Sequence, residues 1–201
     1  MARRVRRSAT DTRTAILDVA EAMLVRVGPA GLRLQDVAET VGVSHPAVLH
    51  HFESREGLIR AVVERASVRL QHDLLQALSR GVAPGSTDLL DRVHETLTDK
   101  GHGRLLAWLM LSGYEPLASD TLRQGWAAIV DATHAKRPPA ARGSREDTAF
   151  AVLLSAFASL AVSIAGKGTF EVAGFGRDRE IEKRFRAWLS RMLAEHLSRK
   201  P

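Results

Sequence analysis

Residues 34–52 have the sequence LQDVAETVGVSHPAVLHHF, which predicts two short helices joined by a tight turn. Its first half repeats apolar residues at helical spacing. Gly42 is typical of a helix end because glycine readily adopts the left-handed backbone, and Ser44 is a preferred N-cap for the next helix. This order is the helix-turn-helix pattern, whose second helix enters the major groove of DNA. Any small helical domain can show the same order, so the flanking sequence must support the interpretation.

Further helices are predicted on both sides of this stretch. The upstream segment carries one apolar stripe, formed by Ile16, Ala20, Met23, Leu24 and Val27. Gly28-Pro29 predicts the end of that helix. Downstream, Ser54 is a suitable cap for a long fourth helix with Glu56 in its first turn. The first part of the chain is therefore predicted to hold three helices that lead into a fourth.

Four motifs follow one another here: Gly-x-x-Gly-Leu-Arg-Leu at 28–34, Asp-Val-Ala at 36–38, Gly-Val-Ser at 42–44 and His-His-Phe-Glu-Ser-Arg-Glu-Gly-Leu at 50–58. Over about residues 12–65 the chain thus resembles the TetR family of transcriptional regulators. The resemblance implies a homodimeric repressor that leaves its double-stranded DNA operator when a small molecule fills the C-terminal domain. The chain departs from the family pattern at Leu32-Arg33-Leu34, which lacks a Ser or Thr cap, and at Pro46 and Ala47, where the family often has Gly and Thr. It also has Leu49 and His51 where the family often has Tyr, so hydroxyls that could bond phosphates are missing.

The predicted DNA contacts gather around the recognition helix. Ser44 places backbone N–H groups at a helix start, where a phosphate is favoured. Pro46 biases His45 away from helical angles, so the helix is expected to begin one residue late, with His45 and Ala47 nearest the bases. Ala47 can offer a methyl contact to thymine. The full predicted set is Arg3, Arg4, Arg6, Arg7, Arg33, Gln35, Ser44, His45, Pro46, Ala47, His50, His51 and Arg55.

Charge is concentrated at the N-terminus. The 201 residues carry a formal net charge of +6 and a sequence pI near 10.4, which suits an acidic partner. Residues 1–13 hold five arginines and one aspartate, whereas residues 14–55 hold three arginines and five acids. This basic arm is expected to lie along phosphates or in the minor groove. A solvated tail without a role is the alternative.

Several classes of protein are not expected. The chain has no cysteine, which excludes disulfides and thiolate metal sites. His45, His50 and His51 do not share one helical face, so no metal site is expected, and no cofactor either. Paired carboxylates, a phosphate-binding glycine loop and a nucleophile elbow are missing, so an enzyme is not expected. Serines interrupt the most apolar run, Ala149 to Ala165, so no membrane span is expected, and a cytoplasmic location is predicted.

The predicted fold class is all-α. A three-helix helix-turn-helix DNA-binding domain at 1–56 is followed by a helical ligand-binding and dimerisation domain at 57–201. The expected helices beyond the recognition helix span about 55–80, 87–99, 104–112, 117–136, 144–165 and 178–198.

Two groups of residues in this second domain are candidates for binding. The segment 104–114 is apolar nearly all round and must be largely buried. In a family-like arrangement a small apolar ligand would contact Trp108, Met110, Tyr114, Trp126 and Phe157, although ordinary core packing is the alternative. Small residues in 144–165 and a broad apolar stripe in the last helix favour pairing about a two-fold axis. The predicted dimer interface is Ala156, Ser159, Leu160, Ser163, Phe185, Trp188, Leu189 and Met192, with packing inside one subunit as the competing interpretation.

The sequence leaves one functional alternative open. A DNA-binding activator, or a regulator that needs no ligand, would have the same features as a ligand-responsive repressor.

We predict that the arm contributes to the salt dependence of operator binding. Each neutralised phosphate adds roughly −0.9 to the slope of log affinity against log salt concentration. Deleting residues 1–8, which include four arginines, should flatten that slope by up to about 3 per subunit. The measurement is a salt titration of operator affinity for both proteins, and an unchanged slope would show that the arm does not touch DNA.

Overall fold

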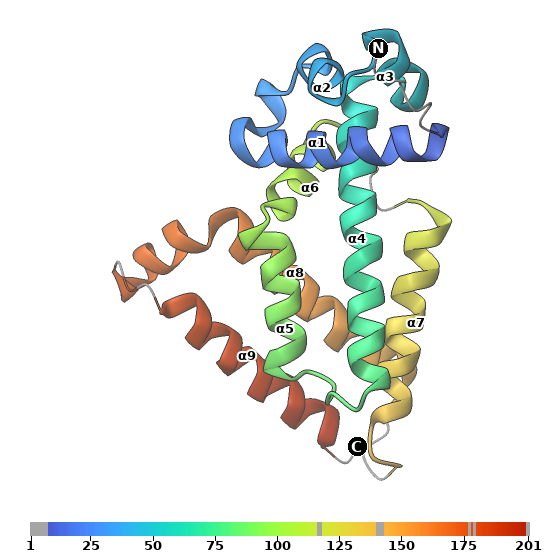
Figure 1. The fold of residues 1–201 in the computed structure, drawn as a ribbon. Helices are drawn as coiled ribbons and strands as arrows, with labels where there is room; N and C mark the ends of the chain where they lie inside the picture. The colour runs from blue at the N-terminus through green and yellow to red at the C-terminus, as the bar shows by residue number, and fades with distance from the viewer. Residues whose placement is uncertain (1–7, 116–117, 140–142, 177, 179, 200–201) are drawn as a thin grey trace.

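The computed structural model describes residues 8–115, 118–139, 143–176, 178 and 180–199. In Figure 1, α1, α2 and α3 pack together around one end of the long helix α4, and the later helices surround its remainder. The described residues form helices and connecting turns without any strand, so the predicted all-α fold class is confirmed.

Helix α1 (Ala9–Gly31) begins with a complete capping box. Ser8 Oγ accepts a hydrogen bond from the backbone N–H of Asp11 at 3.0 Å, and Asp11 Oδ2 accepts one from the N–H of Ser8 at 3.2 Å. The helical backbone breaks at Gly28 (φ 70°, ψ 175°), directly before Pro29. The predicted stop at Gly28-Pro29 is therefore present as a break, after which one more short turn follows.

Three further helices complete the N-terminal half: α2 (Leu34–Val41), α3 (His45–Phe52) and α4 (Arg55–Ser79). Their apolar faces meet in one core with α1 and α6. The fully or almost fully buried members include Ile16, Leu17, Ala20, Val37, Val48, Phe52, Leu58, Ile59, Val62, Leu105 and Leu109. This core continues across the boundary predicted between residues 56 and 57, because the first turns of α4 supply much of it.

The remaining helices match the predicted ranges closely. They are α5 (Thr87–His94), the π-helical turn η1 (Glu95–Asp99), α6 (His102–Leu111), α7 (Asp120–Lys136), α8 (Arg145–Phe170), the π-helical turn η3 (Glu171–Phe175) and α9 (Ile181–Ser198). The helix predicted to end near 165 runs five residues further. The last turns of α8 and the start of α9 project away from the rest of the bundle (Figure 1).

Helix α8 has two apolar faces of different character. Its exposed face, which we call the α8 stripe, consists of the large side chains Phe150, Leu153, Leu154, Phe157 and Ile164. The segment Arg145–Phe175 is long and apolar enough to cross a membrane, with a mean hydropathy of 2.1 in its most apolar window, of which only 11% is buried. The serines in this segment were expected to rule out a candidate span, and that expectation is corrected for length and composition, because Ala, Val, Leu and Ile outweigh the three serines.

The opposite face of α8 carries small residues and packs inside the subunit. Ser159 and Ser163 are buried, and Leu160 packs against the N-terminal core. A Cβ atom added to Gly103 of α6 would lie 2.1 Å from Ser163 Oγ, so the small residues allow α6 to approach α8 closely. The sequence-based expectation placed these serines at the dimer interface, but their close neighbour here is a helix of the same chain.

Of the predicted interface residues in the terminal helix α9, some are covered within the subunit and one is exposed. Leu189 is buried, and Phe185 and Met192 pack against the same small core. Trp188 is half exposed and stacks on Phe185, with ring centroids 5.9 Å apart. Only Trp188 among these residues keeps a large surface available to a partner, because α8 and α5 cover most of the apolar side of α9.

Gly57 is required by the close contact between α3 and α4. A Cβ atom at this position would lie 2.0 Å from the carbonyl oxygen of Phe52. We predict that Gly57→Ala lowers the free energy of unfolding by about 2 kcal/mol, because overpacking forces the backbone to shift. Urea denaturation measures the change. Gly168→Ala is the control, since open space surrounds Gly168 and alanine favours a helix, and an equal loss in both variants would contradict the steric explanation.

Candidate DNA-binding interface and apolar cavity

The turn between α2 and α3 is set by the backbone of Gly42. This residue adopts left-handed angles (φ 80°, ψ 35°), and its N–H donates to the carbonyl of Ala38 at 2.9 Å. The N–H of Val43 donates to the same carbonyl at 3.0 Å. These bonds satisfy carbonyl groups at the end of α2 and redirect the chain sharply, so α3 leaves at a defined angle.

Helix α3 begins at His45, not one residue later as the sequence analysis expected. Ser44 is extended (φ −80°, ψ 151°), and its side chain accepts a hydrogen bond from the N–H of Ala47 at 3.3 Å. Pro46 occupies the first turn, where the backbone N–H groups lack helical partners and a missing N–H costs nothing. The cap therefore outweighs the local bias that proline exerts on His45.

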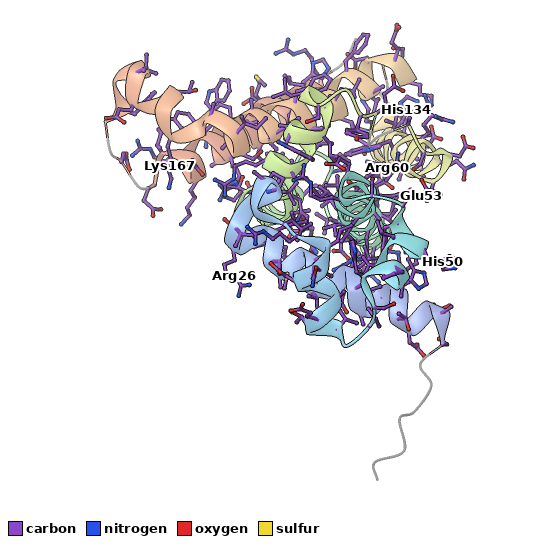
Figure 2. All side chains as sticks on the ribbon, turned by 90° about the horizontal axis from the view of Figure 1, so that it is seen from above. Arg26, His50, Glu53, Arg60, His134 and Lys167 are labelled. Atoms are coloured by element: carbon purple, nitrogen blue, oxygen red, sulfur yellow. The ribbon has the colours of Figure 1, made fainter. Side chains whose placement is uncertain are left out.

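The two sides of α3 differ sharply. Val48 and Phe52 are buried in the N-terminal core, whereas Ser44, His45, Pro46 and His50 are exposed, and Ala47 and His51 are partly exposed. In Figure 2 the side chain of His50 points away from the bundle at the outer edge of these helices. The structure thus brings the predicted contacts of the recognition helix together on one open surface.

The other predicted DNA contacts have mixed placements. Arg33 is exposed at the N-cap of α2 and forms no side-chain cap, as the missing hydroxyl suggested. The side-chain amide of Gln35 donates to Glu39 Oε1 at 3.2 Å along the exposed face of α2. Both residues remain candidates for phosphate contacts. Arg3, Arg4, Arg6 and Arg7 lie outside the described residues.

Arg55 is turned toward the protein body. Its guanidinium donates to Glu56 Oε1 at 2.7 and 3.0 Å, and the same group lies 5.9 Å from the ring centroid of Trp108. A phosphate contact by Arg55 would require this arrangement to open. Trp108, predicted to line a ligand cavity, packs instead against the N-terminal core. Spacing along the sequence could not reveal that α6 reaches the first turn of α4.

Two residues near the end of α3 were not predicted as part of the site. The guanidinium of Arg13 lies 5.2 Å from the ring centroid of Phe52, which places an exposed cation beside the recognition helix. Glu53 has a φ of 65°, an uncommon backbone conformation for a residue with a side chain, and it is exposed next to this surface. The basic charge of the N-terminal segment could have indicated Arg13. No feature of the sequence indicated the strained backbone at Glu53.

An apolar cavity lies between α4, α5, α7, α8 and α9, far along the chain from the recognition helix. Its lining includes Leu74, Leu89, Val93, Trp126, Ile129 and Ala156. The volume is about 60 Å³, well below the roughly 300–1,000 Å³ typical of ligand sites. Of the predicted ligand residues, Trp126 lines this cavity, together with Ala156, which had been predicted at the dimer interface.

The other predicted ligand residues lie elsewhere. Phe157 belongs to the α8 stripe and is 63% exposed, and Met110 is also exposed. Tyr114 packs against the N-terminal core, as Trp108 does. The reason is rotational: residues one position apart on a helix face different directions, and sequence alone does not show which face meets the cavity.

Comparison with known proteins gives concordant results. Residues 16–62 match the family described as bacterial regulatory proteins, tetR family. The HTH-type transcriptional repressor Rv3405c of Mycobacterium tuberculosis (strain ATCC 25618 / H37Rv) is 30% identical over 124 residues, which cover 62% of this chain and 58% of the relative. The chain thus matches little more than half the length of this curated relative.

Two solved structures share the fold over nearly the whole chain. A tetR-family transcriptional regulator from Streptomyces coelicolor has a TM-score of 0.56 at 20% identity, covering 95% of this chain and 80% of that one. The multidrug binding protein EbrR complexed with imidazole has a TM-score of 0.56 at 22% identity, covering 94% of this chain and 96% of that one.

We predict that the exposed histidines of α3 contribute to DNA binding. His45 and His50 are exposed on the recognition helix, where an imidazole nitrogen can contact a base edge or a phosphate. Replacing both by Ala should weaken operator affinity by about 10-fold, because a good base contact is worth about 1–3 kcal/mol. Fluorescence anisotropy with labelled operator measures the effect. His72→Ala, at an exposed position of α4, is the control, and an equal affinity of both variants would remove these histidines from the DNA contacts.

Proposed function

We propose that this chain, which belongs to the TetR family of transcriptional regulators and carries its helix-turn-helix DNA-binding domain, is a homodimeric repressor. In this proposal it binds a pseudo-palindromic DNA operator in the cytoplasm and is released by a small apolar ligand. The observation that carries the proposal is the polarity of α3, whose apolar side is buried while Ser44, His45 and His50 are open to a partner. The related Rv3405c is named a repressor, which supports repression here.

The α8 stripe supports the proposed dimer. Phe150 and Phe157 are 61% and 63% exposed, and Trp188 of α9 adds a half-exposed indole. Large contiguous apolar surfaces mark interaction sites, and two-fold pairing of two such helices from each copy covers them in a four-helix interface. The proposed interface therefore consists of the α8 stripe and Trp188, in place of the small residues that pack against α6.

A two-fold dimer also provides the geometry for DNA recognition. Two copies of α3 about 34–36 Å apart would enter successive major grooves of one duplex. A ligand that changes this spacing needs only about 1–3 kcal/mol of coupling to act as a switch.

The ligand site is the apolar cavity next to Trp126. Its small volume corresponds to a closed form, which a ligand would have to expand by moving the surrounding helices. Its lining is almost entirely aliphatic and aromatic, with Thr133 and Ser155 as the only side-chain hydroxyls among the described lining residues. The complex of EbrR with imidazole supports small-molecule binding by this fold. The same comparisons favour regulation over catalysis.

Repression and activation are separated by a reporter experiment. The operator is first located by footprinting on the DNA upstream of the chain's own coding region. Expression of the protein should then lower transcription from that promoter, and a compound identified by thermal-shift screening should restore it. Ala47→Glu, which places a negative charge on the DNA-facing side of α3, should abolish repression. Increased transcription would favour the activator alternative.

We predict that Phe157→Glu dissociates the dimer. A charge at the centre of the α8 stripe should weaken dimerisation by at least about 30-fold, since central aromatic residues contribute about 2 kcal/mol or more. Analytical ultracentrifugation measures the dissociation constant. Leu111→Glu is the matched control, because Leu111 is 90% exposed at the end of α6, away from the stripe. A Phe157→Glu protein that remains dimeric would place the interface elsewhere.

A further inference from the structure

His102, the first residue of α6, makes polar contacts with two other parts of the protein. The residue is 3% exposed. Its Nδ1 atom lies 3.1 Å from the carbonyl oxygen of Thr96 in η1, and its Nε2 atom lies 3.0 Å from Glu21 Oε1 in α1. The imidazole ring therefore bridges the turn after α5 and the first helix of the DNA-binding domain.

The contact with Thr96 determines which ring nitrogen carries a hydrogen. A carbonyl oxygen can only accept, so Nδ1 is the donor in this contact. Nε2 lies close to the carboxylate oxygen of Glu21 but meets no acceptor in good hydrogen-bond direction. The ring is thus fixed in orientation by one hydrogen bond and one short contact with a carboxylate.

The charges around this ring keep Glu21 ionised. Burial raises the pKa of Glu21, but the hydrogen bond from Arg65 and the positive charges of Arg69 and His102 outweigh it, so the pKa is lowered overall. Arg65 donates to Glu21 at 2.5 Å and to Asp18 at 2.6 Å, and Arg69 donates to Glu21 at 3.2 Å. Glu21 thus receives contacts from α4 and α6 at one point on α1.

The other end of the bridge leads to the apolar cavity. Val93 and Leu89 of α5 line the cavity, and η1 follows α5 directly, from Glu95 to Asp99. A π-helical turn accommodates an extra residue within a helix, and such turns often occur at functional sites. A displacement of α5 by a ligand would therefore reach Thr96 within one turn of the cavity wall.

We propose that His102 is a positioning residue that transmits the state of the cavity to the DNA-binding domain, by tying the Thr96 carbonyl in η1 to Glu21 in α1. The inference deepens the proposed ligand response and depends on it for its biological meaning. In the closed form the bridge holds α1 against α6. When the cavity expands, η1 moves, the ring of His102 loses its contact with the Thr96 carbonyl, and the contact with Glu21 weakens.

Helix α4 is the competing route. It runs from the cavity, which Leu74 and Leu78 line, to the N-terminal core, where Leu58 and Ile59 are fully buried. A rigid α4 could carry the same displacement without His102. The experiment therefore has to separate the imidazole bridge from the helix.

The test uses the full chain without DNA or ligand, so its failure is distinct from a failure of operator binding. Val93→Phe fills the cavity from α5 and replaces the unidentified ligand. Hydrogen exchange of the α1 amides, residues 16–24, reports how firmly that helix is held. Val93→Phe should speed this exchange at least about 5-fold, the lower end of typical allosteric coupling. In a His102→Met background the added effect of Val93→Phe should disappear.

Controls keep the result specific. His134→Met removes another half-buried histidine, which contacts Thr148 rather than α1, and should leave the response intact. If Val93→Phe does not fold, Leu89→Phe fills the same cavity from a less buried position. Glu21→Gln removes the carboxylate that His102 contacts, so it should have the same effect as His102→Met. An equal response with and without His102 would assign the coupling to α4 and overturn the proposal.

A spectroscopic measurement tests the bridge directly. Nitrogen NMR of the His102 ring should show a hydrogen on Nδ1, because the Thr96 carbonyl can only accept. A ring whose hydrogen lies on Nε2 alone would overturn the proposal, because the contact with Thr96 could then not form.

Discussion

The burial of Val48 and Phe52 is the interaction on which the rest of this structure depends. Helix α3 has only eight residues, and an isolated helix of that length is not stable in water. Its recognition surface exists because two apolar side chains anchor it to the core formed by α1 and the first turns of α4. Each exposed residue of α3 takes its direction from those anchors. The DNA-binding surface is therefore a product of core packing.

The same core links recognition to the rest of the protein. Leu105 and Leu109 of α6 are buried in it together with Ile16 of α1, so the second half of the chain reaches directly into the DNA-binding domain. Two contacts that involve charged side chains join the same elements: Arg55 of α4 lies against Trp108 of α6, and His102 of α6 lies against Glu21 of α1. Apolar packing alone tolerates small rotations, whereas charged contacts hold one orientation. In a regulator whose DNA-binding domain changes its angle, making or breaking such contacts can select between the two orientations.

Helix α8 shows how one helix serves two purposes. Its small residues allow α6 to pack closely, with Ser163 near Gly103, while the α8 stripe remains exposed. An exposed apolar stripe of this size marks an interaction site, and the proposed dimer would cover it. The proposed dimer interface and the internal packing therefore use different faces of α8.

Local sequence patterns predicted the elements of this protein well. Ser44, Ser54 and Gly42 act within one helical turn, so the caps, the turn and the order of helices followed from the chain alone. Tertiary structure decided which face of each long helix meets which neighbour, because a helix with two apolar faces has no local preference between them. For this reason Phe157 is exposed and does not line the cavity, and Ser163 packs against α6 of the same chain. The bridge from His102 to Glu21 joins residues 81 positions apart, and only the packing of α6 on α1 brings them together.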